Sequence, residues 1–383
     1  MKKIVCLSTT SFDPLPTRKQ NVMKRLPDCE VLYFDPPVTF LAPLKDKTAF
    51  KKIFKFKEKG YNPQKNITVY TMPPVLPFFN KIRWINTVNQ AISSVYVNSK
   101  IKKHNFQDVI LWCYSPSSCD IVDKIPYKNL VYDCVDRHSG YEGFINPSVV
   151  DTMEEDLAKK SAVVFATAEG LYQTLVDYNK KCHMIPNGCA YELFSSVHTK
   201  TFETPEKLKK AKGKIFGFIG MLQECIAYDY IEELAKARPN DTIVFVGKAL
   251  PGVNLEHLEK YENIIFCGLV PQIELPAYIS KFDVCLNTFS AGKLSKDVSP
   301  LKFYEYLATG KPIVSTREPL QVLDFTSCIY IAQDKETFVQ KCNDALNETN
   351  DIKQNLRMEY AKRCSWTERV KQMHEILKMH EIY

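Results

Sequence analysis

The sequence predicts an α/β protein of two doubly wound parallel-sheet domains that face each other across a cleft. Its 383 residues are enough for about two domains. Short, continuously apolar runs alternate with helix-length segments, which is typical of parallel strands covered on both faces. The alternation occurs as two series separated by a polar, lysine-rich stretch. We therefore expect an N-terminal domain at residues 1–195, a linker at 196–213 and a C-terminal domain at 214–360. A final helix at 361–383 is expected to cross back to the first domain.

The first series contains seven apolar runs, many rich in Val, Ile and aromatic residues. They predict strands at residues 3–8, 29–34, 67–72, 108–114, 130–134, 162–167 and 183–185. Helices are predicted between them at residues 77–103, 118–124, 147–161 and 168–179. In the first of these helices, apolar residues recur with helical spacing at Ile82, Ile85, Val88, Ile92 and Val95, and its last turn is basic.

The second series repeats the pattern with five apolar runs. Strands are predicted at residues 214–219, 242–246, 264–267, 284–287 and 312–315. Helices are predicted at residues 229–238, 272–279 and 300–309, with a helical tail at 358–380. Ligands of such domains bind at the carboxyl ends of the strands, so the segments that follow the strands are the first places to look for a site.

Positive charge is concentrated early in the chain. The formal net charge is +7, and residues 1–103 hold 19 Lys/Arg against 6 Asp/Glu. The densest stretch, residues 45–59, has seven lysines, two acids and three phenylalanines. Basic residues beside aromatic ones favour an anionic membrane surface, and the residues expected there are Lys51, Lys52, Phe54, Lys55, Phe56 and Lys57. The alternative is a solvated basic loop with some aromatics in the core. Nucleic acid is not expected as a partner, because no nucleic-acid-binding motif accompanies the charge.

Cysteine usage favours a reducing compartment. The chain has 13 cysteines, no C-x-x-C pair, and several of the thiols lie inside apolar runs. No Cys/His group has the spacing of metal ligands and no Asp-x-Asp motif occurs, so we expect neither a metal nor a cofactor. The apolar runs are too short to cross a bilayer or to form a signal peptide. These observations predict a cytoplasmic protein, peripheral on the inner face of the cell membrane.

The strongest local motif is SPLKFYEYLATGKPIVS at residues 299–315. Ser299 is a suitable N-cap for a helix that begins near Pro300. Lys302 then lies at the positive end of the helix, where it and free backbone N–H groups can hold a diphosphate. Glu305 is three residues further and faces the same side, where a carboxylate can accept hydrogen bonds from two ribose hydroxyls. The alternative is an ordinary capped helix with a surface Lys–Glu pair.

This motif resembles the donor-sugar-nucleotide segment of glycosyltransferases with the GT-B fold of two Rossmann-like domains, especially the family 4-like group. Other segments follow that family's order, so the resemblance covers nearly the whole chain: YDCVD at 132–136, IPNGCAYELF at 185–194, GFIGML at 217–222, IVFVGK at 243–248 and the run at 264–289. Within the group the chain is most similar to bacterial enzymes of teichuronic-acid and of capsular or exopolysaccharide synthesis. PTRKQ at 16–20 fits them too.

The resemblance implies roles for particular residues. Lys302 would contact the donor diphosphate and Glu305 the ribose, while Gly220 lets a loop approach the phosphates. The donor-binding set implied is Ser299, Lys302, Glu305, Asp297, Gly220, Leu269 and Val270, the last two with backbone groups against the nucleobase. Asp297 stands where the family pattern has the first of two glutamates, and the family's N-terminal histidine is missing near Val135. Both departures weigh against a retaining mechanism.

Asp133 and Asp136 bracket the end of the predicted strand at 130–134, where cleft residues of a parallel sheet are found. In inverting transfer a carboxylate deprotonates the acceptor hydroxyl. Asp136 is similar in place to the general base of an inverting GT-B glucuronosyltransferase, so we assign it as the base with Asp133 in reserve; alternatively, the pair caps a helix or binds a loop. Contacts to acceptor or phosphate are expected from Arg18, His138 and Glu142, although His138 could equally be a surface histidine.

The sequence thus predicts a metal-independent glycosyltransferase of the hexosyltransferase type. It would move a sugar from a nucleotide diphosphate sugar, a UDP-sugar by preference, to a lipid-linked saccharide or polysaccharide acceptor in cell-surface polysaccharide or capsule biosynthesis. One alternative is a nucleotide-sugar epimerase of the same two-domain fold, although it would have no use for the basic, aromatic early segment. Another is a non-catalytic saccharide- or membrane-binding partner, against which Lys302 and Glu305 argue.

Overall fold

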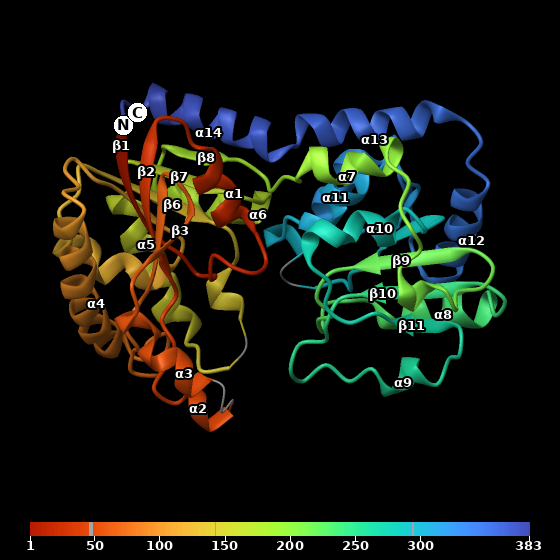
Figure 1. Ribbon diagram of the computed structural model, residues 1–383, viewed down its shortest axis with the longest axis horizontal. Coiled ribbons are helices and arrows are strands. Elements are labelled where there is room, and N and C mark those ends of the chain that lie inside the picture. The colour runs from red at the N-terminus through yellow and green to blue at the C-terminus, as the bar shows by residue number, and fades with distance from the viewer. Residues whose placement is uncertain (46–48, 142, 293–294) are drawn as a thin grey trace. The chain divides into compact units, whose positions relative to one another are not determined.

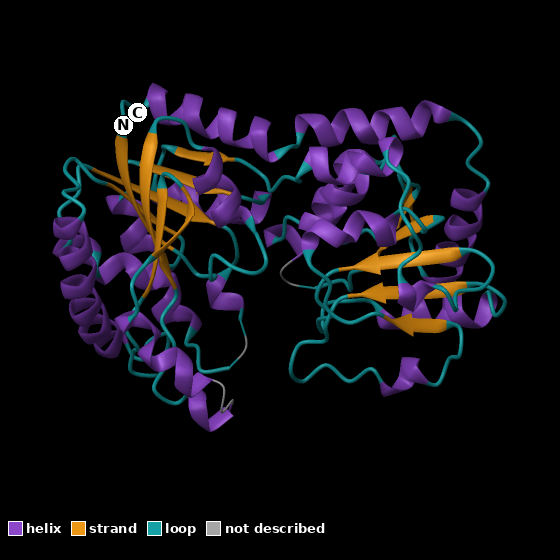
Figure 2. Ribbon diagram, in the orientation of Figure 1, coloured by secondary structure: helices purple, strands orange, loops and turns teal. Residues whose placement is uncertain are grey.

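The computed structural model describes residues 1–45, 49–141, 143–292 and 295–383, and divides into two compact units (Figures 1 and 2). The first unit comprises Met1–Pro186 together with Val370–Tyr383, and the second comprises Asn187–Arg369. Each unit is a parallel β-sheet with helices on both faces, so the predicted fold class is confirmed.

An eight-stranded sheet forms the centre of the first unit, in the order β3-β4-β2-β1-β5-β6-β7-β8. All neighbours are parallel except β3, which pairs antiparallel with β4. The bounds are β1 Lys2–Leu7, β2 Cys29–Asp35, β3 Tyr61–Gln64, β4 Ile67–Thr71, β5 Ile110–Cys113, β6 Asn129–Cys134, β7 Val163–Ala166 and β8 Cys182–Met184. The strand order reverses between β1 and β5, and ligands of doubly wound sheets bind at that point, beyond the carboxyl ends.

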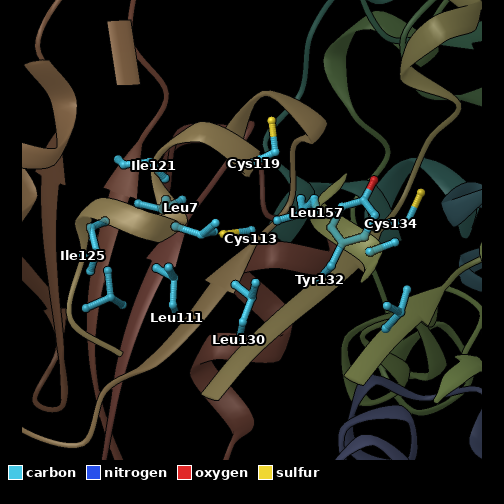
Figure 3. Close-up of a cluster of buried hydrophobic side chains, with 14 of the residues drawn as sticks. Leu7, Leu111, Cys113, Cys119, Ile121, Ile125, Leu130, Tyr132, Cys134 and Leu157 are labelled. Atoms are coloured by element: carbon cyan, nitrogen blue, oxygen red, sulfur yellow. The ribbon is translucent and has the colours of Figure 1, made fainter. Parts of the chain in front are cut away.

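Helices cover both faces of this sheet. α4 (Arg83–Lys103), α5 (Pro147–Lys160) and α6 (Glu169–Tyr178) pack on one face. Figure 3 shows part of that core, in which side chains of β5 and β6 lie beside those of the turns that follow β5. α1 (Arg18–Arg25) and the part of α14 (Trp366–Met379) from Val370 onward pack on the other face. The short helices α2 (Ala42–Lys45) and α3 (Ala49–Phe54) follow β2 in the chain.

The second unit has a fully parallel six-stranded sheet in the order β11-β10-β9-β12-β13-β14. Its strands are β9 Ile215–Ile219, β10 Thr242–Val246, β11 Ile264–Phe266, β12 Val284–Asn287, β13 Ile313–Ser315 and β14 Tyr330–Ile331. One face carries α7 (Tyr191–Thr199), α10 (Leu275–Ile279), α11 (Leu301–Ala308) and α13 (Asp351–Arg363), and the other carries α8 (Tyr228–Ala237) and α12 (Lys335–Leu346). α9 (Glu256–Glu259) lies between β10 and β11 in sequence. Here the strand order reverses between β9 and β12.

The units divide at residues 186 and 187, earlier than the linker expected at 196–213. That stretch is not a free linker, because Leu208 is 3% exposed and packs in the core of the second unit. Phe194, which we expected at the end of the first domain, is fully buried in the same core. The predicted tail helix at 358–380 is two helices, α13 and α14, separated at Cys364. Residues 370–383 belong to the first unit.

Candidate active site

The carboxyl ends of β9 and β12 mark the point of reversal in the second unit, and α11 is fixed against them. The backbone N–H of Ile219, the last residue of β9, donates a hydrogen bond to the Tyr306 hydroxyl of α11 at 2.7 Å. Gly220 follows with φ of +116°, a conformation that L side chains rarely adopt. A Cβ built on Gly220 would lie 3.5 Å from Cε of Lys302. The strand end and the motif predicted from the sequence therefore meet.

Lys302 is held as a half-buried cation at this edge. Its Nζ lies 3.6 Å from the ring centroid of Phe218 and 4.6 Å from that of Phe289. Burial lowers the pKa of Lys302 to about 7, although Cys225 and Glu305 act in the opposite direction. Because the Lys302 ammonium is already partly desolvated, an anion that binds it loses less free energy to further desolvation.

Glu305 lies one turn further along the same face of α11. Its Oε1 accepts a hydrogen bond of 2.9 Å from Nε2 of Gln272, which follows β11. Burial raises the pKa of Glu305 to about 7, while the bond from Gln272 and the charge of Lys302 lower it. The structure therefore brings Lys302 and Glu305 together as expected, and adds Gln272 as a partner of the carboxylate.

The other expected donor residues lie on the loops around this edge. Leu269 is 51% exposed and Val270 is 8% exposed; both follow Gly268, which forms a bridge with Gly247 at the end of β10. Asp297 ends the short turn at Ser295–Asp297 and is nearly buried. Ser299 is not the N-cap, because α11 begins at Leu301 after Pro300.

Ser299 instead bonds to Asn187. Its Oγ accepts a hydrogen bond from the backbone N–H of Asn187 at 3.0 Å, and its backbone carbonyl accepts one from the Asn187 side chain at 2.8 Å. The residue therefore fixes the loop before α11 to the first residue of the second unit. The expected N-cap role of Ser299 is therefore wrong, because its hydroxyl oxygen accepts from the backbone N–H of Asn187 and not from an N–H of α11.

A cavity of about 260 Å³ lies at the point of reversal in the first unit. It is lined by residues that follow β1, β2, β4 and β5, and by one face of α4. Hydroxyl and amide side chains predominate among its polar lining residues: Ser8, Thr9, Asn80, Asn89, Gln90, Ser93, Ser115, Ser117 and Ser118. Such groups can accept and donate hydrogen bonds to sugar hydroxyls, while Leu7, Phe34 and Met72 contribute apolar walls.

His138 and Tyr141 complete the wall of this cavity and lie next to Asp136. Burial lowers the pKa of His138, and its ring bonds to the backbone of Tyr114, whereas Nε2 is buried without a hydrogen-bond partner among the described residues. Asp136 is half-buried two residues beyond β6, and its charge opposes the effect of burial on the pKa of both His138 and Lys19. The hydrogen bond from Tyr141 to Asp136 and the burial of Tyr141 raise the Tyr141 pKa. Asp136 and His138 are thus brought together as expected.

The structure corrects the roles expected of Asp133, as a reserve base, and of Arg18, as a contact to acceptor or phosphate. Asp133 is fully buried, and Nε of Arg18 donates to its two carboxylate oxygens at 2.9 and 3.0 Å. Arg18 is 2% exposed and also donates to the backbone carbonyls of Ile185 and Pro186. A carboxylate engaged in a buried ion pair cannot serve as a reserve base, and the guanidinium cannot reach a ligand. Glu142, the third expected contact, lies outside the described residues.

The residues expected at a membrane surface lie in α3 and in the turn Lys55–Lys57. Lys51, Lys52, Lys55 and Lys57 are exposed, as is Phe54 at 48%. Phe56, which we expected at the membrane surface, is instead half-buried, with its ring centroid 6.1 Å from that of Tyr96. Within the described residues no helix is long and apolar enough to cross a bilayer. The same residues contain no group of three or more His, Cys, Asp or Glu able to hold a metal ion.

Comparisons with known proteins show what the chain is similar to. Residues 213–348 match the family model of glycosyl transferases group 1. The Bacillus subtilis protein TuaH, named as a teichuronic acid biosynthesis glycosyltransferase, is 26% identical over 230 residues, which are 56% of this chain and 57% of TuaH. The alignment thus spans little more than half the length of that relative.

Two solved structures match over nearly their whole length. One is the Escherichia coli trehalose-6-phosphate protein bound with UDP-2-fluoro glucose, with a TM-score of 0.71 and 12% identity over 98% of this chain and 99% of that one. The other is HepE of Anabaena in complex with UDP, with a TM-score of 0.65 and 15% identity over 99% and 100%. The chain has the GT-B fold, and its residues 213–348 are similar to the group 1 glycosyl transferases. The predicted resemblance is therefore confirmed.

Several residues of these GT-B half-sites were not predicted from the sequence. Phe218, Phe289 and Gln272 lie beside Lys302 or Glu305, and apart from His138 the polar lining of the first-unit cavity was missed. The motif GFIGM, in which Phe218 stands two residues before the glycine at a strand end, is a signal that could have found one of them. The cavity residues come from six separate segments of the chain, so no local pattern marks them.

Proposed function

We propose that this chain is a metal-independent glycosyltransferase that moves a hexose from a UDP-sugar to a hydroxyl of a lipid-linked saccharide or polysaccharide. The reaction would belong to cell-surface polysaccharide biosynthesis and would take place at the inner face of the membrane. The name of TuaH supports the pathway class, and the nucleotides bound in the E. coli and HepE structures support UDP as the carrier.

One observation carries the proposal: Lys302 and Glu305 lie on one face of α11 beside the ends of β9 and β12. Lys302 would bind the diphosphate, Glu305 the two ribose hydroxyls, and the loop at Leu269 and Val270 the base. The leaving UDP carries negative charge, and the Lys302 ammonium next to the free N–H groups of α11 would stabilise it without a divalent ion.

The first unit would hold the acceptor in its polar cavity. Asp136 would take the proton from the acceptor hydroxyl, whose oxygen attacks the anomeric carbon while the bond from that carbon to the diphosphate oxygen breaks. His138, whose Nε2 has no hydrogen-bond partner in the part of the chain that the structure describes, would accept a hydrogen bond from the acceptor. The products are the glycosylated acceptor and UDP.

Calorimetric titration with UDP tests the proposal. The Lys302→Ala variant should bind UDP at least tenfold more weakly than the wild type, because a charge-assisted bond to the diphosphate is lost. Lys236→Ala, on the exposed surface of α8 in the same unit, is the matched control and should leave the affinity unchanged. Equal UDP affinity in the Lys302→Ala variant and the wild type would remove the residue from the site. Conversion of a UDP-sugar to its epimer without any acceptor would instead identify an epimerase.

A further inference from the structure

Along residues 84–95, α4 carries mostly polar residues on its buried side and apolar residues on its outward side, whereas Val97 and Ile101 pack in the core as in an ordinary surface helix. The side of α4 that packs against the first unit contains four buried polar residues, Asn86, Asn89, Ser93 and Ser94. Its outward side carries Trp84, Val88, Ile92 and Val95, which are 64, 40, 56 and 72% exposed. These four residues, which we call the α4 stripe, are spaced four, four and three apart and so share one face. In Figure 1, α4 forms an outer edge of the first unit.

Charge is also missing from the outward side of α4 before its last turn. Residues 82–99 are all described, and the exposed ones are Ile82, Trp84, Thr87, Val88, Ile92, Val95 and Ser99, none of which is charged. Arg83 donates instead to Asp120 and Asp156, at 2.8 and 2.9 Å. A helix face in permanent contact with water is normally charged, whereas contiguous exposed apolar surface marks an interaction site.

The buried polar side of α4 has a clear use, because Asn89, Gln90 and Ser93 line the first-unit cavity. The side chain of Asn89 also bonds to both the N–H and the carbonyl of Leu76, and Asn86 donates to the carbonyl of Ser117. The inward polarity of the helix is therefore fixed by the cavity and its supporting loops. The outward stripe has no partner within the described part of the first unit.

We infer that the α4 stripe docks onto an anionic membrane surface, with the helix lying in the interface. Exposed lysines lie at one end of it, Lys102 and Lys103 in the last turn of α4, and on the segment at residues 51–57, which carries Lys51, Lys52, Lys55 and Lys57. That segment is joined to α4 because the Tyr96 hydroxyl donates to the carbonyl of Phe56 at 2.9 Å. Apolar residues that enter the interface beside lysines that meet lipid phosphates are what such binding requires.

The charges favour a membrane over a second copy of this chain. In a two-fold dimer the same patch meets itself, so the lysines near one stripe would face the lysines near the other. Their repulsion would oppose such pairing. An anionic lipid surface has the opposite charge and accepts the stripe and the lysines together.

What membrane docking would do for the reaction rests on the proposed function, in which the acceptor is lipid-linked. An α-helix with its side chains is about 10–12 Å across, so the cavity lies about one helix diameter from the stripe. An apolar helix face sinks about 5–10 Å into the headgroup boundary. The cavity would then lie near the level of the lipid headgroups, where the saccharide of a membrane-anchored acceptor can enter it.

Trp84 provides a built-in probe of this face, because it is 64% exposed while Trp112 and Trp366 are at most 2% exposed. On addition of vesicles of equal parts phosphatidylcholine and phosphatidylglycerol, Trp84 emission should shift to shorter wavelength and become protected from iodide. Cosedimentation with the same vesicles should fall at least tenfold in the Ile92→Asp/Val95→Asp variant. Ile352→Asp is the matched control, since Ile352 is 67% exposed on α13 of the second unit.

Three results would overturn the inference. The first is binding of the wild type to the vesicles with Trp84 still fully quenched by iodide, and the second is no binding at all. The third is a wild-type dimer, seen by sedimentation equilibrium, that the Ile92→Asp/Val95→Asp variant dissociates. Near-UV circular dichroism, to which the buried Trp112 of the first unit contributes, shows whether the variant is folded. UDP affinity is measured on the same samples, and its absence from the wild type would refute the proposed function while leaving the membrane test intact.

Discussion

The affinity for UDP should depend on pH through Lys302, whose pKa burial lowers from 10.5 to about 7. A diphosphate is an anion, so it binds the ammonium form of Lys302. In the free protein this form is about half populated at pH 7 and about 3% populated at pH 8.5. Because the apparent affinity is reduced in proportion to the competent fraction, the Kd for UDP should rise about 15-fold over this range.

The sign follows from the direction of the pKa change. The bound diphosphate raises the pKa of Lys302 again, so binding takes up a proton whenever the pH is above the pKa of the free protein. Affinity is therefore lost as the pH rises. Titration calorimetry in two buffers of different ionisation enthalpy measures this proton, and about half a proton should be taken up at pH 7 and close to one at pH 8.5.

Two variants separate this effect from other titrations. In Lys302→Arg the guanidinium stays charged over the whole range, so the Kd should be nearly independent of pH. In Glu305→Gln the carboxylate is lost; UDP should bind more weakly at every pH, and the decline above pH 7 should persist. A wild-type Kd that changes less than threefold between pH 7 and 8.5, or binding without proton uptake, would refute the reasoning.

Two further substitutions test the first unit. Asp136→Asn should lower the rate at which UDP is released from a UDP-sugar in the presence of membranes by about 10²–10⁴-fold, as expected on removal of a general base. The affinity for UDP should be unchanged. Turnover near that of the wild type would show that Asp136 is not the base, and His138 would be the next candidate. Asp133→Ala should lower the free energy of unfolding by about 3–5 kcal/mol, since it leaves the buried Arg18 unpaired. Urea denaturation measures this loss, and Glu155→Ala, which breaks the exposed pair with Lys159, should cost less than about 1 kcal/mol.

The order of elements could be predicted because burial in a parallel sheet leaves a clear trace in the sequence. The run at β5 is apolar throughout and that at β10 is apolar after Thr242, and both ends of α5 lie within one position of the prediction. β3 could not be predicted, because all four of its residues are exposed and its pairing with β4 leaves no apolar pattern. α1 was missed for the opposite reason: its buried residues include Arg18, Lys19, Gln20 and Asn21, which a pattern search assigns to the surface.

The residues of the candidate site also differ in how far the sequence could reveal them. Lys302 and Glu305 could be found because one helix turn holds both, so their spacing in the sequence is their spacing in space. Asp133 and Asp136 could not be told apart in this way, since they lie only three positions apart at the end of the same strand: Asp133 is in β6 and Asp136 is two residues beyond it. What distinguishes them is Arg18, which lies 115 residues away from Asp133 and removes it from solvent. A contact at that separation leaves no local pattern.

The departures from ordinary burial in this chain have a common physical meaning. In a sequence that folds to one structure, apolar residues are buried and charged residues are exposed almost everywhere. Exceptions are expected at functional sites, where a ligand provides the missing favourable contacts. The Lys302 ammonium is one exception: a cation held among aromatic rings, whose lowered pKa a diphosphate would restore. α4 is another, because a helix with buried asparagines and exposed isoleucine and valine is stable in water only at a cost. If the stripe meets lipid while its polar side meets the acceptor, both faces of that helix lie against the medium that suits them.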